Sequence, residues 1–435
     1  MRICAAIGST EEIKKHTSAD IAEIRLDVFK KIPDNLDIPR LVTFKGTPDY
    51  SVLPEGFNEM MDIGESEIPI TNAMVISSYH DMANTPSATK ITEIMKDMKG
   101  DIAKGAFAVN RFTDLTSIYD ASKMLDRKHV LIGMNELGMI TRIRSALLNN
   151  EFTFAHTGTP TAAGQLSIEE MKRLGDKCMI TGIVGHPLSH SLSQKIHNLA
   201  FENTGINGIY LKFDVLSLDG IEDVIRDFDI RGLNVTIPYK TDIIQHLDEI
   251  DETARTVGAV NTVTNKDGHL IGTNTDVIGI DTAFKRANMK LNASKKILIM
   301  GSGGSAKACI FNFKRKGAEV HVTGRNVKTV TELCDRFDCD PTKNADPTEY
   351  DVIVNCTPMG MYSEASYPFE IDRITSDQAI FDLVYGVDTP LKKLAKERGC
   401  KTIEGMDMLV GQGLRSFHIW TKKTPDFDTI KEAIG

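Results

Sequence analysis

The 435-residue sequence lacks the features of a membrane or secreted protein. No stretch approaches the roughly 18 consecutive apolar residues of a membrane-spanning helix, and the N-terminus has no apolar signal-peptide core. The seven cysteines are odd in number and scattered, without the spacing of a zinc site or of a compact disulfide framework. We therefore expect a cytoplasmic protein with free thiols, no membrane partner and no metal.

The sequence also lacks a block of positive charge, an internal repeat and a low-complexity tract. Its formal net charge of −9 argues against a general nucleic-acid binder, so small molecules are the expected partners. The length exceeds the roughly 250–300 residues at which one core usually splits, so we expect several domains. Whether the chain forms a homodimer is left open by the sequence.

A glycine-rich turn lies near the middle of the chain, in a segment that reads as strand, turn, helix and strand. The turn consists of Gly301, Ser302, Gly303, Gly304, Ser305 and Ala306. Glycines let the backbone approach a pyrophosphate, and the free N–H groups of a helix start hold the anion. A glycine motif alone is weak evidence, but this order of elements predicts a Rossmann-type dinucleotide domain.

The second strand of that segment, Glu319–Thr323, indicates which dinucleotide binds. It ends without the Asp or Glu that would accept the 2′-hydroxyl of NAD. Instead Arg325, Asn326 and Lys328 follow it, and these side chains suit a 2′-phosphate. The predicted cofactor is NADP(H).

Short β-rich runs fill the chain before a seam near residues 170–178. They are Arg2–Ile7, Ile21–Val28, Arg40–Phe44, Phe57–Ile63, Ala73–Tyr79, Asp101–Val109, His129–Met134 and Phe152–His156. Eight strands with mostly helical connections predict an α/β fold, a (β/α)8 barrel. Lys45–Gly56 and Gly64–Asn72 are too short or too rich in Pro and Gly for full helices. The barrel would therefore be trimmed to about 170 residues, where 200 or more is typical.

Two side chains at adjacent strands of this barrel suggest imine chemistry. Lys104 lies inside an otherwise apolar strand, where a lysine is costly unless it is paired or partly neutral. A lowered pKa would make Lys104 a nucleophile for a carbonyl. His80 closes the preceding strand. Alone, Lys104 could equally be part of a structural ion pair and His80 a turn histidine; together they favour a Schiff base.

Several motifs make residues 1–170 resemble the type I 3-dehydroquinate dehydratases. They are Glu23-x-Arg25-x-Asp27, Ser78-x-His80-Asp81, Ile102-x-Lys104, Gly138–Arg142, Phe152–Ala155 and Thr161–Gln165. The resemblance implies that Lys104 forms an iminium with the substrate ketone and that His80 moves the proton. It implies that the remaining polar residues bind the substrate, namely Glu23, Arg25, Arg142, Thr161 and Gln165. Lys45 stands where the family usually has Arg, which keeps the charge but loses the guanidinium fork.

Clusters of small polar residues precede the glycine turn. They are Ser189–Ser193, Asn234–Lys240, Gly258–Thr262 and Gly272–Asp276. Such side chains suit a polyhydroxylated ligand, since each can donate and accept. Lys240 and Asp276 add one cation and one anion, and a lysine held by a carboxylate can relay a proton to a forming alkoxide. The alternatives are helix capping by Ser191 and a surface ion pair between Lys240 and Asp276.

These clusters, with the closing segment Met408–Gly413, resemble the shikimate dehydrogenases over residues 179–435. The resemblance implies a catalytic pair, Lys240 and Asp276. It implies substrate binding by Ser189, Ser191, Thr236, Asn261, Tyr385 and Gln412. It implies that Thr357, Leu383 and Gly405 border the cofactor. Asp407 and Gly413 depart from the family's usual Gly and Ala.

The sequence therefore predicts a bifunctional enzyme of the shikimate route, a 3-dehydroquinate dehydratase joined to an NADP-dependent shikimate dehydrogenase. The expected domains are a barrel at 1–170, a substrate-binding domain at 178–281 plus 405–435, and a Rossmann domain at 282–404. One alternative is an inert barrel attached to a working shikimate or quinate dehydrogenase. Another is a nucleotide-binding regulator without turnover. A short linker, Ser167–Lys177, motivates the further hypothesis that the intermediate is channelled.

Overall fold

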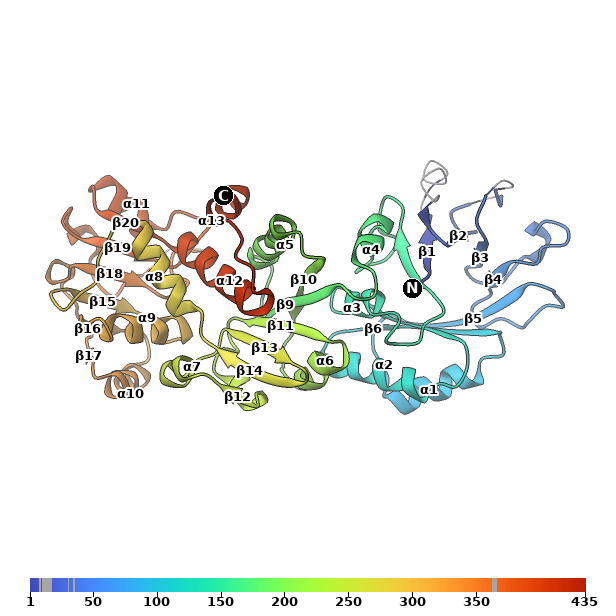
Figure 1. The fold of residues 1–435 in the computed structure, drawn as a ribbon, viewed down its shortest axis with the longest axis horizontal. Helices are drawn as coiled ribbons and strands as arrows, with labels where there is room; N and C mark the ends of the chain where they lie inside the picture. Colours follow the sequence, from blue (N-terminus) through green and yellow to red (C-terminus); the bar gives the residue numbers. More distant parts are fainter. Residues whose placement is uncertain (8, 10–17, 30, 34–35, 362–365) are drawn as a thin grey trace. The chain divides into compact units, whose positions relative to one another are not determined.

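The computed structural model describes residues 1–7, 9, 18–29, 31–33, 36–361 and 366–435. By their internal contacts these residues form two compact units. The first is Met1–Ile180 with Asn207–Ile230, and the second is Thr181–Ile206 with Arg231–Gly435. Both units contain helices and strands (Figure 1), so the predicted α/β class is confirmed.

The first unit contains an eight-stranded sheet with neighbour order β7-β6-β5-β4-β3-β2-β1-β8 and parallel pairing throughout. Its strands are β1 (Ile3–Ala6), β2 (Ile21–Arg25), β3 (Arg40–Thr43), β4 (Met60–Asp62), β5 (Met74–Asp81), β6 (Ile102–Ala108), β7 (His129–Met134) and β8 (Thr153–His156). The N–H of Glu151, just before β8, donates to the carbonyl of His129 in β7 over 3.0 Å. The sheet is thus a nearly closed barrel, and all eight predicted strands are confirmed.

Helices cover only part of this barrel. They are α1 (Ala88–Asp97), α2 (Phe112–Met124), α3 (Met139–Ile143) and α4 (Ile168–Leu174). Between β2 and β5, the described residues form no α-helix, only the 3-10 turn η2 (Tyr50–Val52). The trimming after β3 and β4 is confirmed, but the expectation of mostly helical connections is wrong between β2 and β3. The connection from β1 to β2 lies largely outside the described residues.

Local sequence explains both the missing helices and an unexpected one. Gly46, Gly56 and Gly64 have φ of +82°, +72° and +62°, a conformation that ends helices. The predicted linker Ser167–Lys177 is instead mostly α4. Ser167 and Glu170 form a capping box there, each side chain accepting from the other's backbone N–H. A capped helix therefore occupies most of the segment that the sequence analysis treated as a linker.

A second sheet has the order β10-β9-β11-β13-β14-β12. Its strands are β9 (Met179–Gly185), β10 (Gly208–Asp214), β11 (Ile230–Val235), β12 (Glu249–Ile250), β13 (Thr262–Lys266) and β14 (His269–Thr273). The accompanying helices are α5 (Ser193–Thr204), α6 (Ile221–Asp227), η3 (Asp242–His246), α7 (Glu252–Val257) and α8 (Asp276–Arg286). Polar side chains at the ends of β11 and β14 lead directly into the second candidate site.

A third sheet is parallel throughout, with order β17-β16-β15-β18-β19-β20. Its strands are β15 (Lys296–Met300), β16 (Glu319–Thr323), β17 (Asp340–Pro341), β18 (Val352–Asn355), β19 (Ala379–Asp382) and β20 (Lys401–Glu404). Its helical segments are α9 (Gly304–Lys314), α10 (Val327–Phe337), η4 (Pro347–Glu349), η5 (Ile371–Arg373) and α11 (Pro390–Glu397). This is the Rossmann strand order, which reverses between β15 and β18 and leaves a crevice there.

Helices pack on both faces of the third sheet because β15 alternates its side chains. Ile297 and Ile299 join the core that includes Cys309 of α9, whereas Leu298 joins the core that includes Leu391 of α11. Two further helices, α12 (Gly405–Thr421) and α13 (Phe427–Ile434), end the chain, and α12 packs along α8 (Figure 1). The two strands that border the crevice, β15 and β18, are therefore fixed by an apolar core on each face of the sheet.

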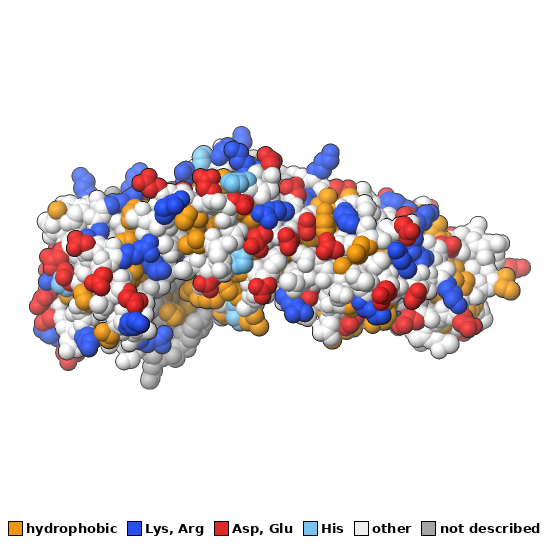
Figure 2. Space-filling model, turned by 90° about the horizontal axis from the view of Figure 1, so that it is seen from below, with side chains coloured by type: hydrophobic (Ala, Val, Ile, Leu, Met, Phe, Trp, Pro, Cys, Tyr) orange, Lys and Arg blue, Asp and Glu red, His pale blue; other side chains and the backbone are white. Residues whose placement is uncertain are grey.

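The described surface mixes charges of both signs. On the face drawn in Figure 2, Lys and Arg side chains are interspersed with Asp and Glu. Among the described helices none is long and apolar enough to cross a membrane. All seven cysteines are free, with Cys309 buried as core.

Candidate active sites

Lys104 of β6 forms a buried ion pair inside the barrel. Its Nζ lies 2.8 Å from Oδ2 of Asp62 and 4.8 Å from the ring centre of Phe154. Burial lowers the pKa of Lys104, but the negative charges of Asp62 and Glu23 outweigh burial, and the pKa is raised. The pKa of Lys104 is thus raised and not lowered as the sequence suggested, because Asp62 stabilises the ammonium form.

Asp62 was not among the predicted site residues. Its Oδ1 accepts hydrogen bonds from the Ser78 hydroxyl at 2.6 Å and from the Gly64 N–H at 3.1 Å. Burial raises the pKa of Asp62, but Lys104 and these hydrogen bonds outweigh burial and lower it. The sequence signal was available: Asp62 interrupts an apolar strand, as Lys104 does.

The other predicted catalytic residue of the barrel, His80, is exposed at the end of β5. Desolvation of its ring, then the positive charges of Lys104 and Lys45, lower the pKa of His80 to about 4. His80 is therefore a neutral base at neutral pH. Lys45 itself is exposed.

The predicted substrate-binding residues of the barrel differ in how they are engaged. Glu23 is buried and accepts from the Thr43 hydroxyl over 2.9 Å. Arg25 is held by an ion pair to Asp27 at 2.6 Å. Arg142 is engaged differently from both of these side chains.

Arg142 on α3 is buried, and its Nε has no hydrogen-bond partner among the described residues. Burial lowers the pKa of Arg142 to about 10. An incompletely paired buried cation is costly, and an anionic group bound beside it would offset that cost.

Thr161 and Gln165 form a hydrogen bond with each other over 3.0 Å. A separate cavity of about 510 Å³, lined by residues such as Glu65, contains none of the predicted dehydratase residues.

In the second unit a cavity of about 480 Å³ gathers most of the predicted residues. Those lining it are Ser191, Thr236, Lys240, Asn261, Asp276, Ser305, Thr357, Leu383, Tyr385, Gly405 and Gln412. Ser189 is exposed and is not among the lining residues. His190, Ser193 and Asn234 line it and were not predicted, although they lie in the same polar clusters.

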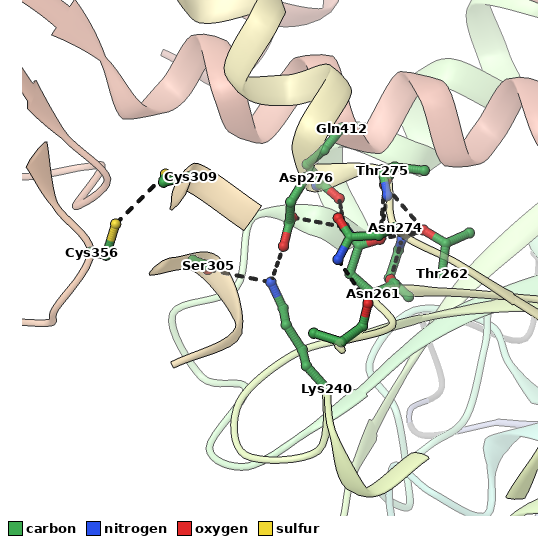
Figure 3. Close-up of polar contacts among 12 residues, drawn as sticks. Lys240, Asn261, Thr262, Asn274, Thr275, Asp276, Ser305, Cys309, Cys356 and Gln412 are labelled. Atoms are coloured by element: carbon green, nitrogen blue, oxygen red, sulfur yellow. Dashed lines mark hydrogen bonds and ion pairs between the residues drawn. The ribbon is translucent and has the colours of Figure 1, made fainter. Parts of the chain in front are cut away.

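Lys240 and Asp276 both line this cavity, and their side chains point toward each other (Figure 3). Lys240 Nζ lies 2.6 Å from Oδ2 of Asp276 and 3.4 Å from the Ser305 hydroxyl of α9. The Asn261 amide donates to Oδ1 of Asp276 at 2.7 Å and to the Gln412 amide oxygen at 3.2 Å. Both carboxylate oxygens of Asp276 thus accept a hydrogen bond, and this arrangement holds Lys240 at the wall of the cavity.

A buried network of hydroxyl groups fixes the orientation of the Asn261 side chain. Asn261 Oδ1 accepts the Thr275 backbone N–H at 2.7 Å, and the hydroxyls of Thr262 and Thr275 both contact Ser416. Ser416 lies on α12, one turn beyond Gln412. Helix α12 therefore orients the site from two positions, which the sequence alone did not reveal.

The glycine turn fits a dinucleotide phosphate. Gly301 has φ of +116°, and a Cβ there would lie 3.1 Å from Thr357 Cγ2. Gly303 borders open space, and α9 begins at Gly304. Ser302 is partly exposed at this turn, whereas Ala306 is buried in the core. Free backbone N–H groups at this helix start are suited to bind a pyrophosphate.

The end of β16 presents exposed polar side chains, Arg325, Asn326 and Lys328. Asn326 also caps α10, accepting the Thr329 N–H over 3.2 Å. Arg325 and Lys328 stay the predicted partners of a 2′-phosphate, and their exposure is compatible with that role.

Comparison with known proteins assigns the family of the second half. The NADP(+)-type shikimate dehydrogenase of Methanosphaera stadtmanae is 38% identical over 278 residues, which is 59% of this chain and 96% of that protein. The chain belongs to the shikimate dehydrogenase family. Family models described as the shikimate dehydrogenase substrate binding domain and the shikimate 5′-dehydrogenase C-terminal domain match residues 183–263 and 405–434.

The first half matches a different family model, type I 3-dehydroquinase, over residues 58–176. Both predicted resemblances, and their combination in one chain, are therefore confirmed.

Solved structures agree with the shikimate dehydrogenase assignment. The Thermus thermophilus shikimate 5-dehydrogenase, solved with NADP(H) and shikimate, is 32% identical with a TM-score of 0.55, covering 59% of this chain and 98% of that one. The quinate dehydrogenase of Corynebacterium glutamicum, solved with NAD, is 28% identical with a TM-score of 0.54, covering 59% and 98%.

Proposed function

We propose that this chain is a bifunctional enzyme that dehydrates 3-dehydroquinate to 3-dehydroshikimate and reduces that product to shikimate with NADPH. The observation that carries the proposal is a carboxylate-paired lysine in each matched half, Lys104 with Asp62 and Lys240 with Asp276. The domains proposed for these activities are 1–170 for the dehydratase, 178–281 plus 405–435 for shikimate binding, and 282–404 for NADP. The free thiols support a reducing, cytoplasmic location.

In the dehydratase, Lys104 must lose a proton before its amine can attack the substrate ketone. Asp62, 2.8 Å away, holds Lys104 in the ammonium form until that step and keeps its Nζ in position. Once the iminium has formed, it draws electrons from the neighbouring carbon and acidifies its proton. His80, neutral at physiological pH, removes that proton and returns it to the departing hydroxyl as water leaves.

Binding of the acidic substrate in the barrel is assigned to Arg142, whose buried guanidinium suits a carboxylate. The ring hydroxyls are assigned to the remaining polar side chains, Glu23, Arg25, Lys45, Thr161 and Gln165. Arg25 would share its guanidinium between Asp27 and the substrate.

In the reductase, bound NADPH supplies the hydride. Lys240 donates a proton to the oxygen of the ketone, and Asp276 holds the ammonium group in position. The carboxylate is assigned to Ser191 and Thr236, and the ring hydroxyls to Asn261, Gln412 and Tyr385; all five side chains line the same cavity. The start of α9 and Arg325 would hold the phosphates, with Thr357, Leu383 and Gly405 beside the nicotinamide half.

The two activities can be separated in one cuvette. Adding 3-dehydroquinate alone should raise the absorbance of the conjugated enone, and adding NADPH should then consume the NADPH signal. Lys104→Ala should abolish the first change and retain reduction of supplied 3-dehydroshikimate; Lys240→Ala should do the reverse. If the wild-type chain reduces 3-dehydroshikimate but produces no enone and no borohydride-trapped adduct on Lys104, the barrel is an inert scaffold.

Quinate is the competing substrate, since a quinate dehydrogenase shares the fold at 28% identity. Comparing kcat/KM for shikimate and quinate in the oxidative direction decides between them. A higher value for quinate would contradict the shikimate assignment while leaving the dehydratase assignment standing.

A further inference from the structure

Two cysteines lie face to face at the wall of the reductase cavity (Figure 3). The Sγ of Cys309, in α9, is 3.7 Å from the Sγ of Cys356, the first residue after β18. Cys309 is fully buried, whereas Cys356 is half-buried and lines the cavity. Neither reaction proposed above uses a thiol.

We propose that Cys309 and Cys356 form an oxidation site, at which a peroxide converts the two thiols into a disulfide that weakens NADP(H) binding. The linkage itself follows from the placement of the two sulfur atoms. Its effect rests on the proposed function of the adjoining cleft.

Access determines which thiol reacts first. Cys356 borders the cavity, so a small oxidant can reach it. Cys309 has no exposed surface, and burial, followed by the neighbouring Cys356, raises the pKa of its thiol well above the ordinary range. Cys356 is therefore the attacking thiol and Cys309 the resolving one.

The oxidation takes two balanced steps. The Cys356 thiolate attacks one oxygen of hydrogen peroxide, so that an S–O bond forms, the O–O bond breaks and hydroxide leaves as water after taking up a proton. The sulfur is oxidised by two electrons and the peroxide is reduced. The Cys309 sulfur then attacks the Cys356 sulfur, the S–S bond forms, the S–O bond breaks, and hydroxide leaves with the Cys309 proton as a second water.

Closing the bond changes the cleft because its two ends belong to the cofactor-binding elements. A disulfide has an S–S length of about 2.05 Å, so the sulfur atoms must move about 1.7 Å closer than their present 3.7 Å. Cys309 lies in the helix that begins at the glycine turn. Cys356 precedes Thr357, whose Cγ2 would lie 3.1 Å from a Cβ added at Gly301. The link therefore pulls together the two segments between which the dinucleotide would bind.

Peptide mapping of the full chain tests the linkage directly. The reduced protein is treated with hydrogen peroxide, alkylated without reductant and digested with trypsin. The expected product joins peptide 308–314, which holds Cys309, to peptide 344–373, which holds Cys356. Absence of this product while Cys356 becomes oxidised would overturn the proposal.

Variants and ligand protection sharpen the test. Cys309→Ala should give no linked peptide and should leave a sulfenic acid on Cys356 that dimedone captures. Cys339→Ser, which removes a half-buried thiol outside the cavity, should link Cys309 to Cys356 as the wild type does. Saturating NADP⁺ should slow linkage; linkage at an unchanged rate with NADP⁺ bound would contradict the placement of Cys356 in the cofactor cleft.

The effect on cofactor binding is tested by measuring the dissociation constant for NADP⁺ in three samples: the reduced protein, the oxidised protein, and the oxidised protein after treatment with dithiothreitol. We expect an increase of about tenfold in the linked form, reversed by the reductant. An unchanged constant in fully linked protein would overturn the proposed effect. If the reductase assignment itself were wrong, the reduced protein would neither bind NADP⁺ nor reduce 3-dehydroshikimate, whether or not the linked peptide forms.

Discussion

The two paired lysines are both nearly removed from solvent. The side chains of Lys104 and Asp62 are 6% and 1% exposed, and those of Lys240 and Asp276 are 13% and 4% exposed. In the barrel the folded-state pKa of Lys104 is raised and that of Asp62 is lowered. Their pairing therefore stabilises the fold between the ordinary pKa of aspartate, about 4, and that of lysine, about 10.4. Its contribution is lost as pH falls through the lowered pKa of Asp62 or rises through the raised pKa of Lys104.

Replacing Asp62 tests how the barrel controls its nucleophile. Asp62→Asn removes the charge that outweighs burial, so the pKa of Lys104 should fall. Borohydride trapping with 3-dehydroquinate over a pH series should then show its midpoint at lower pH than in the wild type. Because the carboxylate that holds Lys104 Nζ in position is also lost, kcat for dehydration should fall about 10²-fold. The exposed Asp97→Asn on α1 is the control, and equal trapping midpoints in both variants would refute the role of Asp62.

His80 gives a second prediction at the residue scale. Since desolvation and then Lys104 and Lys45 lower its pKa to about 4, His80 is already a base well below neutral pH. The profile of kcat/KM for dehydration should therefore show no acidic limb from His80 above about pH 5. His80→Ala should lower kcat about 10²–10⁴-fold without preventing the borohydride-trapped adduct. An acidic limb near pH 6.5 that disappears in His80→Ala would show that the histidine titrates normally.

At the scale of the element, the first residue of α9, Gly304, packs against the side chain of Lys240 and leaves no room for a Cβ atom. A Cβ at Gly304 would lie 2.9 Å from Cδ and 3.2 Å from Cβ of Lys240. Gly304→Ala should displace Lys240 from Asp276 and lower kcat for reduction about tenfold or more, while dehydratase activity stays unchanged. At the neighbouring Gly303 an added Cβ meets open space, so Gly303→Ala should lower kcat much less. Equal losses of kcat in the two variants would show that the contact with Lys240 is not the cause.

The elements that the sequence predicted well are those with a strong local signal. Apolar runs bounded by polar residues located the eight barrel strands, and the glycine turn with its flanking strands located the dinucleotide fold. The polar clusters located the second cavity because the ends of β11 and β14 and the start of the antiparallel β13 meet at one edge. Ser189 and Ser191 are alike in sequence, yet only Ser191 lines the cavity, since the backbone turn between them is not encoded in residue type.

The misses arise where distant residues decide the outcome. The pKa of Lys104 depends on Asp62, 42 positions away. The network behind Asn261 depends on Ser416 of α12, which no local pattern connects to β13. The helix α4 could have been predicted, because Ser167 and Glu170 have capping-box spacing before an apolar pattern. Sequence reasoning was thus limited by tertiary contacts in two cases and by an overlooked local motif in one.

At the scale of the whole molecule, the contact-defined first unit includes a segment from beyond the seam, Asn207–Ile230. Two aromatic side chains of α2 pack against this segment. Phe112 contacts Phe213 and Tyr119 contacts Phe228, with ring centres 5.7 Å apart in each pair. The segment therefore shares an apolar core with the barrel. A segment that the sequence analysis assigned to the substrate-binding domain, 178–281, therefore packs into the core of the dehydratase unit.

Arg144 is the polar counterpart of this core and gives the last prediction. The guanidinium is buried and donates to the carbonyls of Phe228 at 3.0 Å, Asp176 at 2.7 Å, Cys178 at 3.0 Å and Asp229 at 3.3 Å. Arg144→Leu keeps the apolar stem but leaves these carbonyls without their donor, so the unfolding free energy of the first unit should fall by about 2–4 kcal/mol. Urea unfolding followed by dehydratase activity measures this loss.

Arg111→Leu is the matched control for Arg144→Leu. Arg111 has a 70% exposed side chain and pairs with Asp114 in the first turn of the helix that it precedes, so its loss should cost about 1 kcal/mol or less. If both variants unfold at the wild-type urea concentration, Asn207–Ile230 is not a stabilising part of the dehydratase unit. If only Arg144→Leu shifts, a dehydratase excised at the seam should be less stable than the same barrel in the intact chain, because it lacks both the aromatic partners and the carbonyls that Arg144 binds.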